Sequence, residues 1–179
     1  HAGWMQRSYY QQLPLLPLGT EAIAELLRDL LGTDASVTSL GRLIRERTSG
    51  IPFFIEEIVQ SLAEAGSLEG RKGAYRLVRP VAELALPTTV QAVLAARVDR
   101  LEEREKQVLQ TAAVIGRQFT EPILRRVVEL PETDLARALE KLAAAEFIFE
   151  QALYPQAEYI FKHALTQEVA YGSLSGPLR

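Results

Sequence analysis

The chain has 179 residues, of which 47% are hydrophobic and 24% are charged, and its formal net charge is −3. This composition is typical of a globular chain, and the charge gives no overall attraction to nucleic acid or to an anionic membrane. With no cysteine and two histidines, His1 and His163, disulfides, thiol catalysis and a multi-histidine metal site are excluded. We therefore assign no catalytic residue and no metal ligand, and no apolar run approaches the roughly 20 residues that span a bilayer.

The first 18 residues are aromatic and polar and then rich in leucine and proline, with no acidic side chain. The two prolines of LPLLPL predict an extended segment, because proline disfavours a helix there. Since the chain also begins without Met, we expect a piece of a longer protein, in which residues 1–18 leave a preceding domain.

Apolar residues at helical spacing predict a helical bundle with one hairpin over residues 19–101. In chain order, the expected elements are a helix that Thr20 caps and Gly32 ends, a helix over 36–48, a helix from Pro52 to near Gly66, a hairpin over 67–78, a connector over 79–87, and a helix that Thr88 caps.

Residues 102–179 show a second pattern, in which three helices precede two alternating strands and a final helix. The expected helices cover 103–115, 121–128, 132–146 and 164–174, and the strands flank a turn that contains Pro155. Three helices followed by a hairpin is the winged-helix layout. The predicted fold class is therefore mainly α: a helical bundle followed by a winged-helix domain, with two short β-hairpins.

A winged helix can bind DNA, but the charges of the expected recognition helix oppose that function. Residues 132–146 carry four acidic and two basic side chains, and the turn of the wing has no Lys or Arg. DNA binding usually depends on several Lys or Arg contacts to phosphates.

Other candidate groups are few. The adjacent pairs Glu56–Glu57 and Glu102–Glu103 should diverge on a helix and form solvated faces. His163 follows the second wing strand and opens the last helix, where it can be a capping or solvated histidine or a ligand for an anion. No G-x-x-x-x-G-K-[ST] cradle for phosphates and no apolar run leading into an acidic magnesium ligand occur in the chain.

Several segments together resemble one family. RTSGIPFFIEEIVQSL resembles the lid motif of STAND-class AAA+ ATPases, LPTTVQAVLAARVDRLEEREKQVLQTAAVIGRQF resembles the stretch that joins lid to winged helix, and FKHALTQEVAYGSL resembles the end of that winged helix. RSYYQQLPLLPL resembles the exit from the nucleotide-binding domain. Similar segments occur in bacterial signalling proteins that combine such an ATPase with class III adenylate/guanylate cyclase domains and TPR-like repeats.

The resemblance implies three parts: residues 1–18 as the exit from a missing nucleotide-binding domain, 19–101 as a helical lid, and 102–179 as a winged helix. It implies that Pro52 contacts the adenine of ATP or ADP and that His163 contacts the β-phosphate of ADP. Walker A, Walker B and the magnesium ion would belong to the preceding domain, so this piece would not be catalytic by itself. Lys162-His163-Ala164 lacks the acidic neighbour of the related M-H-D motif, and Ile51 stands where many relatives have Asn.

The function implied by the resemblance is a nucleotide-dependent conformational switch in a cytoplasmic signalling ATPase. Its implied partners are its own nucleotide-binding domain, TPR-like repeats that follow it, and other copies of the parent protein. Two alternatives remain open from sequence: a winged-helix transcription regulator, and a scaffold that binds proteins without nucleotide.

Overall fold

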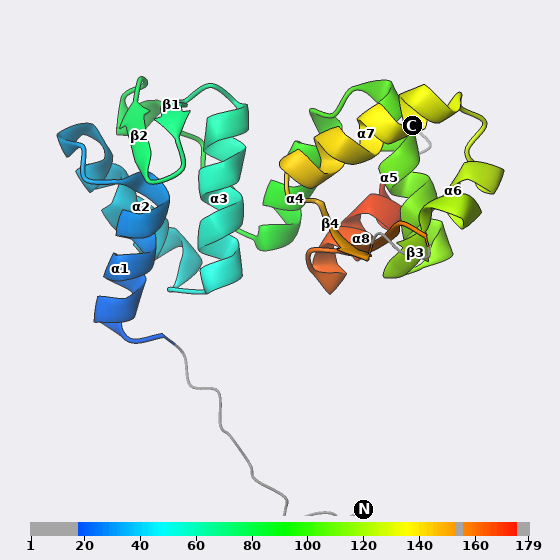
Figure 1. The fold of residues 1–179 in the computed structure, drawn as a ribbon. Helices are drawn as coiled ribbons and strands as arrows, with labels where there is room; N and C mark the ends of the chain where they lie inside the picture. Colours follow the sequence, from blue (N-terminus) through cyan, green and yellow to red (C-terminus); the bar gives the residue numbers. More distant parts are fainter. Residues whose placement is uncertain (1–17, 153–155, 175–179) are drawn as a thin grey trace, which may run out of the picture.

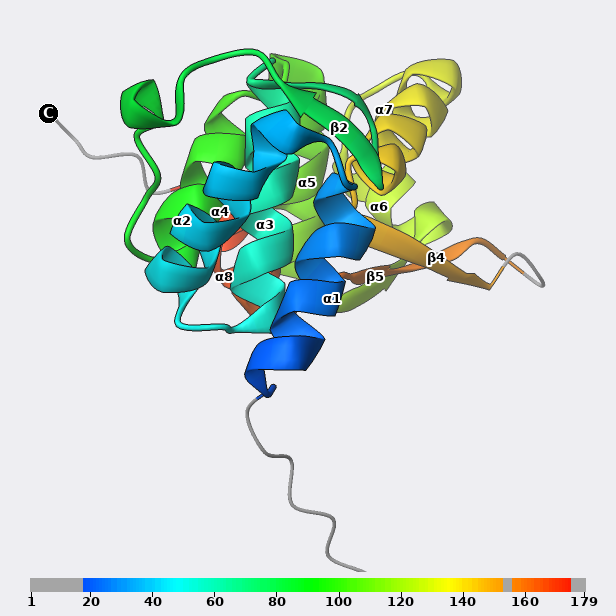
Figure 2. The same ribbon diagram turned by 90° about the vertical axis from the view of Figure 1, so that its left-hand side faces the viewer.

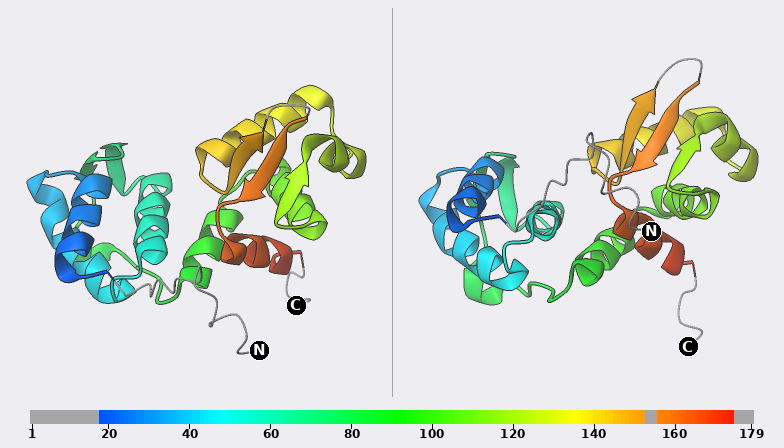
Figure 3. Two further views of the ribbon diagram at one scale, coloured as in Figure 1. Left: turned by 60° about the horizontal axis from the view of Figure 1, so that its bottom comes forward. Right: turned by 90° about the horizontal axis from the view of Figure 1, so that it is seen from below.

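The computed structural model describes residues 18–152 and 156–174, and within them the chain is mainly helical with two small antiparallel sheets. The mainly α fold with short hairpins is thus confirmed. The elements form two groups on either side of α4 (Figures 1 and 3). The predicted exit segment, except Leu18, and the turn at Pro155 lie outside the described residues.

The first group packs three helices against a hairpin. Its elements are α1 (Thr20–Leu31), α2 (Thr38–Thr48), α3 (Pro52–Glu64), β1 (Leu68–Arg71) and β2 (Ala74–Leu77), with short 3-10 helices at Ala35–Val37 and Val81–Glu83. Helix α1 ends at Gly32, as predicted, where φ is 91° and a Cβ atom would lie 2.6 Å from the carbonyl oxygen of Gly73. This close approach of two backbones requires glycine.

Two predicted helix caps are wrong by one residue, and one helix begins later than predicted. Thr20 is the first residue of α1, and Gly19 is its N-cap, with no side-chain hydrogen bond. Thr89, not Thr88, caps α4 (Val90–Asp99) by accepting from the amide of Ala92. The side chain of Asp34 accepts from the amide of Ser36 and stabilises a 3-10 turn, so that α2 begins at residue 38.

The second group contains α5 (Glu103–Ile115), β3 (Gln118–Thr120), α6 (Glu121–Val127), α7 (Glu132–Ala144), β4 (Ile148–Ala152), β5 (Glu158–Phe161) and α8 (Ala164–Gly172). The strands pair in the order β3–β5–β4, all antiparallel. The hairpin β4–β5 projects from the body of this group (Figure 2). The third strand, β3, was not predicted, because three residues are too few to show alternation.

Two clusters of buried apolar side chains fill the two groups. Helix α4 contributes to both: Val93 packs in the cluster of α1–α3, and Val98 packs in the cluster of α5–α8. The change from one core to the other therefore occurs within α4, before residue 101. Helix α4 packs against both α3 and α8 and so connects the two groups.

Candidate functional site

The first turn of α3 presents Pro52, the first of the two predicted site residues, at the surface. Pro52 is the N1 residue of the helix, where its fixed φ suits the first turn and no amide hydrogen is needed. Ile51 beside it is 55% exposed. The sequence thus places a small apolar surface, Ile51–Pro52, at the start of α3.

His163, the second predicted site residue, is the N-cap of α8. Its backbone is extended, with φ −147° and ψ 153°, and its Nδ1 atom accepts a hydrogen bond from the amide of Leu165 at 3.1 Å. A ring nitrogen that accepts a hydrogen bond carries no proton, so this geometry assigns the neutral tautomer with the proton on Nε2. The capping role considered from sequence is what the structure shows.

The structure brings the neighbourhoods of Pro52 and His163 together. The ring of Phe53, the residue after Pro52, stacks on the imidazole of His163, with centroids 4.2 Å apart and planes inclined by 18°. The Nζ atom of Lys162 lies 6.0 Å from the centre of the same phenyl ring. The start of α3 and the junction between β5 and α8 therefore form one contact between the two groups.

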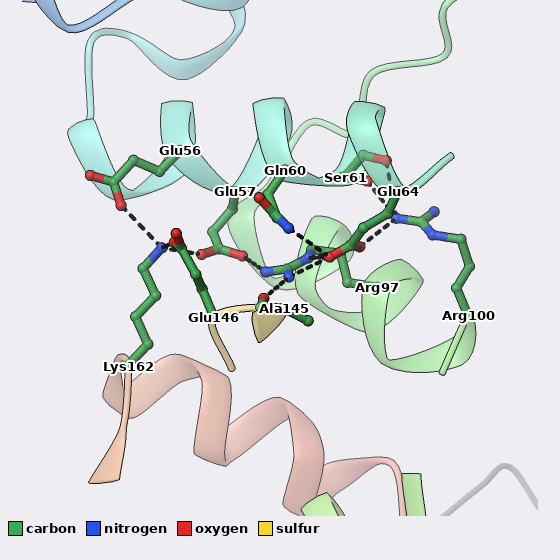
Figure 4. A network of polar contacts seen from close by, with 10 residues as sticks. All are labelled: Glu56, Glu57, Gln60, Ser61, Glu64, Arg97, Arg100, Ala145, Glu146 and Lys162. Atoms are coloured by element: carbon green, nitrogen blue, oxygen red, sulfur yellow. Dashed lines mark hydrogen bonds and ion pairs between the residues drawn. The ribbon is translucent and has the colours of Figure 1, made fainter. Parts of the chain in front are cut away.

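Lys162 continues this contact into a network of ion pairs (Figure 4). Its Nζ atom lies 3.1 Å from Glu56, 3.3 Å from Glu57 and 2.9 Å from Glu146. Two of these carboxylates belong to α3, and the third follows α7. The prediction that Glu56 and Glu57 diverge into solvent is wrong, because the ammonium group of Lys162 lies between α3 and β5 and is within reach of both.

Arg97 of α4 forms the buried centre of the network. Its guanidinium group pairs with Glu57 and with Glu64, the latter at 2.6 Å, and donates to the carbonyl oxygen of Ala145. It also lies 4.3 Å from the centre of the Phe147 ring. Arg97 and Glu57 are only 1% and 0% exposed, so both charges depend on their ion pairs for compensation: Arg97 on Glu57 and Glu64, and Glu57 on Arg97 and Lys162.

The charged forms of the network are strongly favoured. Burial acts to lower the pKa of Arg97, but the carboxylates of Glu64 and Glu57 outweigh it and raise the pKa. Burial likewise acts to lower the pKa of Lys162, and Glu146 and Glu57 raise it above its ordinary value. Burial acts to raise the pKa of Glu146, but Lys162 and Lys72 hold that pKa below its ordinary value. We call Glu56, Glu57, Glu64, Arg97, Glu146 and Lys162 the interface network.

One feature of the sequence indicated this network and was not used in the prediction: two charged residues stand at apolar positions of their helices. Arg97 lies on the apolar stripe of α4, between Leu94 and Val98, and Glu57 lies between the buried residues Phe54 and Ile58 of α3. A charged residue on an apolar stripe must find a partner when it is buried. The sequence does not identify the partner, because Glu57 and Arg97 are 40 residues apart.

The network offers no group suited to acid–base catalysis or metal binding. Its carboxylates are engaged by cations, and no group of three or more His, Asp or Glu that could hold a metal occurs among the described residues. Nor is any helix in residues 18–152 and 156–174 long and apolar enough to cross a membrane.

Helix α7, the expected recognition helix, has few cations available for phosphates. Lys141 lies 2.9 Å from both Glu102 and Glu105. Asp134, in the first turn of α7, pairs with Arg104 of α5 at 3.2 Å. These contacts show α7 packed against the acidic start of α5.

Comparison with known proteins gives one match. A family described as "Domain of unknown function (DUF8739)" matches residues 19–69, which span α1 to the start of β1. No curated protein matches the chain. No solved structure matches it.

Proposed function

We propose that the chain is the lid and winged-helix region of a STAND-class signalling ATPase, in which it couples the nucleotide state to an output domain. The contact that carries this proposal is the stack of Phe53 on His163. It joins the helix that begins with Pro52 to the residue that caps α8, and these are the two positions that the family resemblance relates to ADP. The mainly helical fold with two short hairpins supports the proposal.

The residues at this contact fit the two nucleotide contacts in different ways. Ile51 and Pro52 offer an exposed apolar surface that suits the face of an adenine ring. His163 has the Nε2 hydrogen left to donate to a phosphate oxygen, because Nδ1 is engaged by Leu165. ATP or ADP, held with magnesium by the preceding domain, would supply the charge that distinguishes the two states.

The neutral state of His163 changes the expected size of its effect. A charge-assisted bond from an imidazolium would contribute on the order of 1.5–3 kcal/mol, whereas a neutral N–H donor contributes about 0.5–1.5 kcal/mol. A bond of about 1 kcal/mol shifts an equilibrium about fivefold.

The interface network explains how a change at His163 would reach the lid. Lys162 precedes His163 in the chain and is bound to Glu56 and Glu57 of α3. A displacement of His163 from Phe53 would therefore draw Lys162 away from α3 and expose the Arg97–Glu57 pair. Because a buried ion pair tolerates little intermediate separation, the interface favours two discrete arrangements over a gradual one.

The parent protein would hold the remaining parts. We propose that a nucleotide-binding domain with Walker A and Walker B precedes residue 1, that TPR-like repeats follow, that the protein acts in the cytoplasm, and that the output is of the nucleotide-cyclase type. The pairing of Lys141 and the acidity of α7 support this function over DNA binding.

Titration calorimetry tests the proposal on two proteins. The 179-residue chain alone is expected to bind neither ATP nor ADP with micromolar affinity, since it supplies only an adenine surface and one donor. The full-length parent is expected to bind both. Micromolar binding by the chain alone, or a parent without nucleotide affinity, would contradict the proposed function.

A further inference from the structure

A hollow of about 380 Å³ lies between α1 and α2, away from the interface network. Three buried apolar side chains line it: Leu27, Leu31 and Val37. It exists because small residues line both helices. A Cβ atom on Gly41 would meet only the Cδ1 atom of Leu31, at 3.9 Å.

A second hollow, of about 310 Å³, adjoins the first at the turn Thr33–Asp34 and extends along Ala74, Tyr75 and Arg76 of β2. Figure 2 shows α1, α2 and β2 on the same face of the first group. We call the two hollows together the arginine groove. All residues that line the first hollow fall within the 19–69 segment that matches the family of unknown function.

The charge of the groove is strongly positive for a chain of net charge −3. Arg28, Arg42, Arg45 and Arg76 line it, and none of them forms an ion pair within the residues that the structure describes. The acidic residues of α1 and α2 do not line the groove.

The one carboxylate in the lining, Asp34, is outnumbered by the four arginines. Asp34 accepts from the amide of Ser36 at 2.8 Å. Its hydrogen bonds with Ser36 and, to a smaller extent, the charge of Arg76 hold its pKa below the ordinary value, and burial opposes the hydrogen bonds more weakly. Arginines without an ion pair also occur elsewhere in the described residues, for example Arg47 and Arg126. The groove differs in that four such arginines gather around one pair of adjoining hollows.

We propose that the arginine groove binds an acidic peptide segment that inserts an apolar side chain between α1 and α2. A guanidinium group matches a carboxylate with two parallel hydrogen bonds, and arginines without partners are prepared to make them. The apolar floor would stay wet under a simple inorganic anion, whereas a Leu or Ile side chain would cover it. The two adjoining hollows favour an extended ligand over a compact one.

Fluorescence anisotropy with labelled peptides tests this proposal on the 179-residue chain. The probes are peptides of about ten residues in which two leucines are separated by one to four glutamates, together with matched peptides in which the leucines are serines. At physiological salt, at least one leucine-containing peptide is expected to bind, and its serine counterpart is expected to bind about tenfold more weakly.

Three variants locate the site. Arg42→Ala and Gly41→Met are each expected to weaken binding about tenfold, the first by removing a donor and the second by filling the hollow without changing charge. Arg47→Ala is the matched control, since Arg47 is exposed on the same helix but does not line the groove. Circular dichroism confirms that each variant is folded.

Three results would overturn the proposal. The first is that no peptide binds, and the second is that Arg47→Ala weakens peptide binding as much as Arg42→Ala does. The third is that the serine peptides bind as tightly as the leucine peptides, which would show attraction by charge alone. Tighter binding of a single-stranded oligonucleotide than of every peptide would instead assign the groove to nucleic acid.

Discussion

Glu146 occupies, after α7, the conformation that Gly66 occupies after α3. Both residues have left-handed backbones, with φ of 57° and 66°. Each donates its amide to the carbonyl three residues earlier, and the next amide donates to the carbonyl five residues earlier, in both cases within 2.9–3.0 Å. Glycine adopts this conformation readily, whereas another residue is disfavoured by roughly 1 kcal/mol.

The ion pairs of the Glu146 carboxylate explain why a glutamate, and not a glycine, stands at this position. It lies 2.9 Å from Lys162 and 3.4 Å from Lys72, and so connects both hairpin regions to the end of α7. We infer that the ion pairs offset the unfavourable backbone. The same conformation after α3 carries Gly66, where no side chain is present to form an ion pair.

Two substitutions of Glu146 separate the backbone from the carboxylate. Glu146→Gln removes the charge and keeps the unfavourable backbone, so we expect the free energy of unfolding to fall by about 1 kcal/mol, a modest value because the side chain is partly exposed. Glu146→Gly also removes the charge but relieves the backbone, and should be about as stable as the wild type. Urea unfolding measures both; a glycine variant less stable than the glutamine variant would refute this explanation.

The pair Arg97–Glu57 should behave as a buried ion pair. Arg97→Met removes the cation that pairs with both Glu57 and Glu64 and leaves the buried Glu57 with Lys162, so we expect a loss of about 3 kcal/mol in unfolding free energy. The double variant Arg97→Met with Glu57→Leu should be more stable than Arg97→Met, because the buried carboxylate that lost the guanidinium is gone. A double-mutant cycle by urea unfolding checks the coupling, and additive losses would show that the two residues do not depend on each other.

The network should make stability depend on pH at acid values. The pKa of Glu146 is lowered in the folded chain, so its contribution is present above the ordinary value of 4.5 and is lost as pH falls through the folded pKa. The pKa of Lys162 is raised, so its contribution is present at neutral pH and is lost only as pH rises through a value above 10.5. Glu146→Gln should flatten the acid dependence of unfolding free energy; identical slopes for variant and wild type would contradict the assignment.

Helix boundaries were predictable where a local residue determines them. Pro52 at the start of α3 and Gly32 at the end of α1 each act within one turn, and both were placed correctly. Adjacent threonines 88 and 89 offer equal caps, so the sequence could not choose between them. Strand β3 (Gln118–Thr120) was missed because its three residues are held by pairing with β5, in which the partner of Phe119 is Tyr159, far away in the sequence.

The candidate site was predictable only in part. Pro52 and His163 were singled out by resemblance, and the structure shows His163 stacked on Phe53, the residue after Pro52. The interface network was missed because its members come from α3, α4, the end of α7 and the end of β5. Only the packing of these elements brings the charges together, and no spacing along the chain encodes that packing.

The capping role of His163 predicts a difference between two variants of the 179-residue chain. His163→Ala removes the acceptor for the Leu165 amide and should lower the unfolding free energy by about 1 kcal/mol. His163→Ser restores an oxygen that can cap α8, so much of that loss should be recovered, although the stack on Phe53 is gone. Equal stability of the two variants in urea unfolding would show that the cap contributes little.

The ratio of ADP to ATP affinity in the full-length parent tests the proposed switch most directly. His163→Ser keeps the cap of α8 and removes the Nε2 donor. Arg126→Ala serves as the control, since Arg126 is exposed on α6 and lies outside the segments that resemble the ATPase family. We expect His163→Ser to weaken ADP binding about fivefold, as loss of a neutral hydrogen bond implies, and to leave ATP binding and the control unchanged. An unchanged ratio of the two dissociation constants in a folded His163→Ser parent would show that His163 is a structural cap alone and would contradict the account.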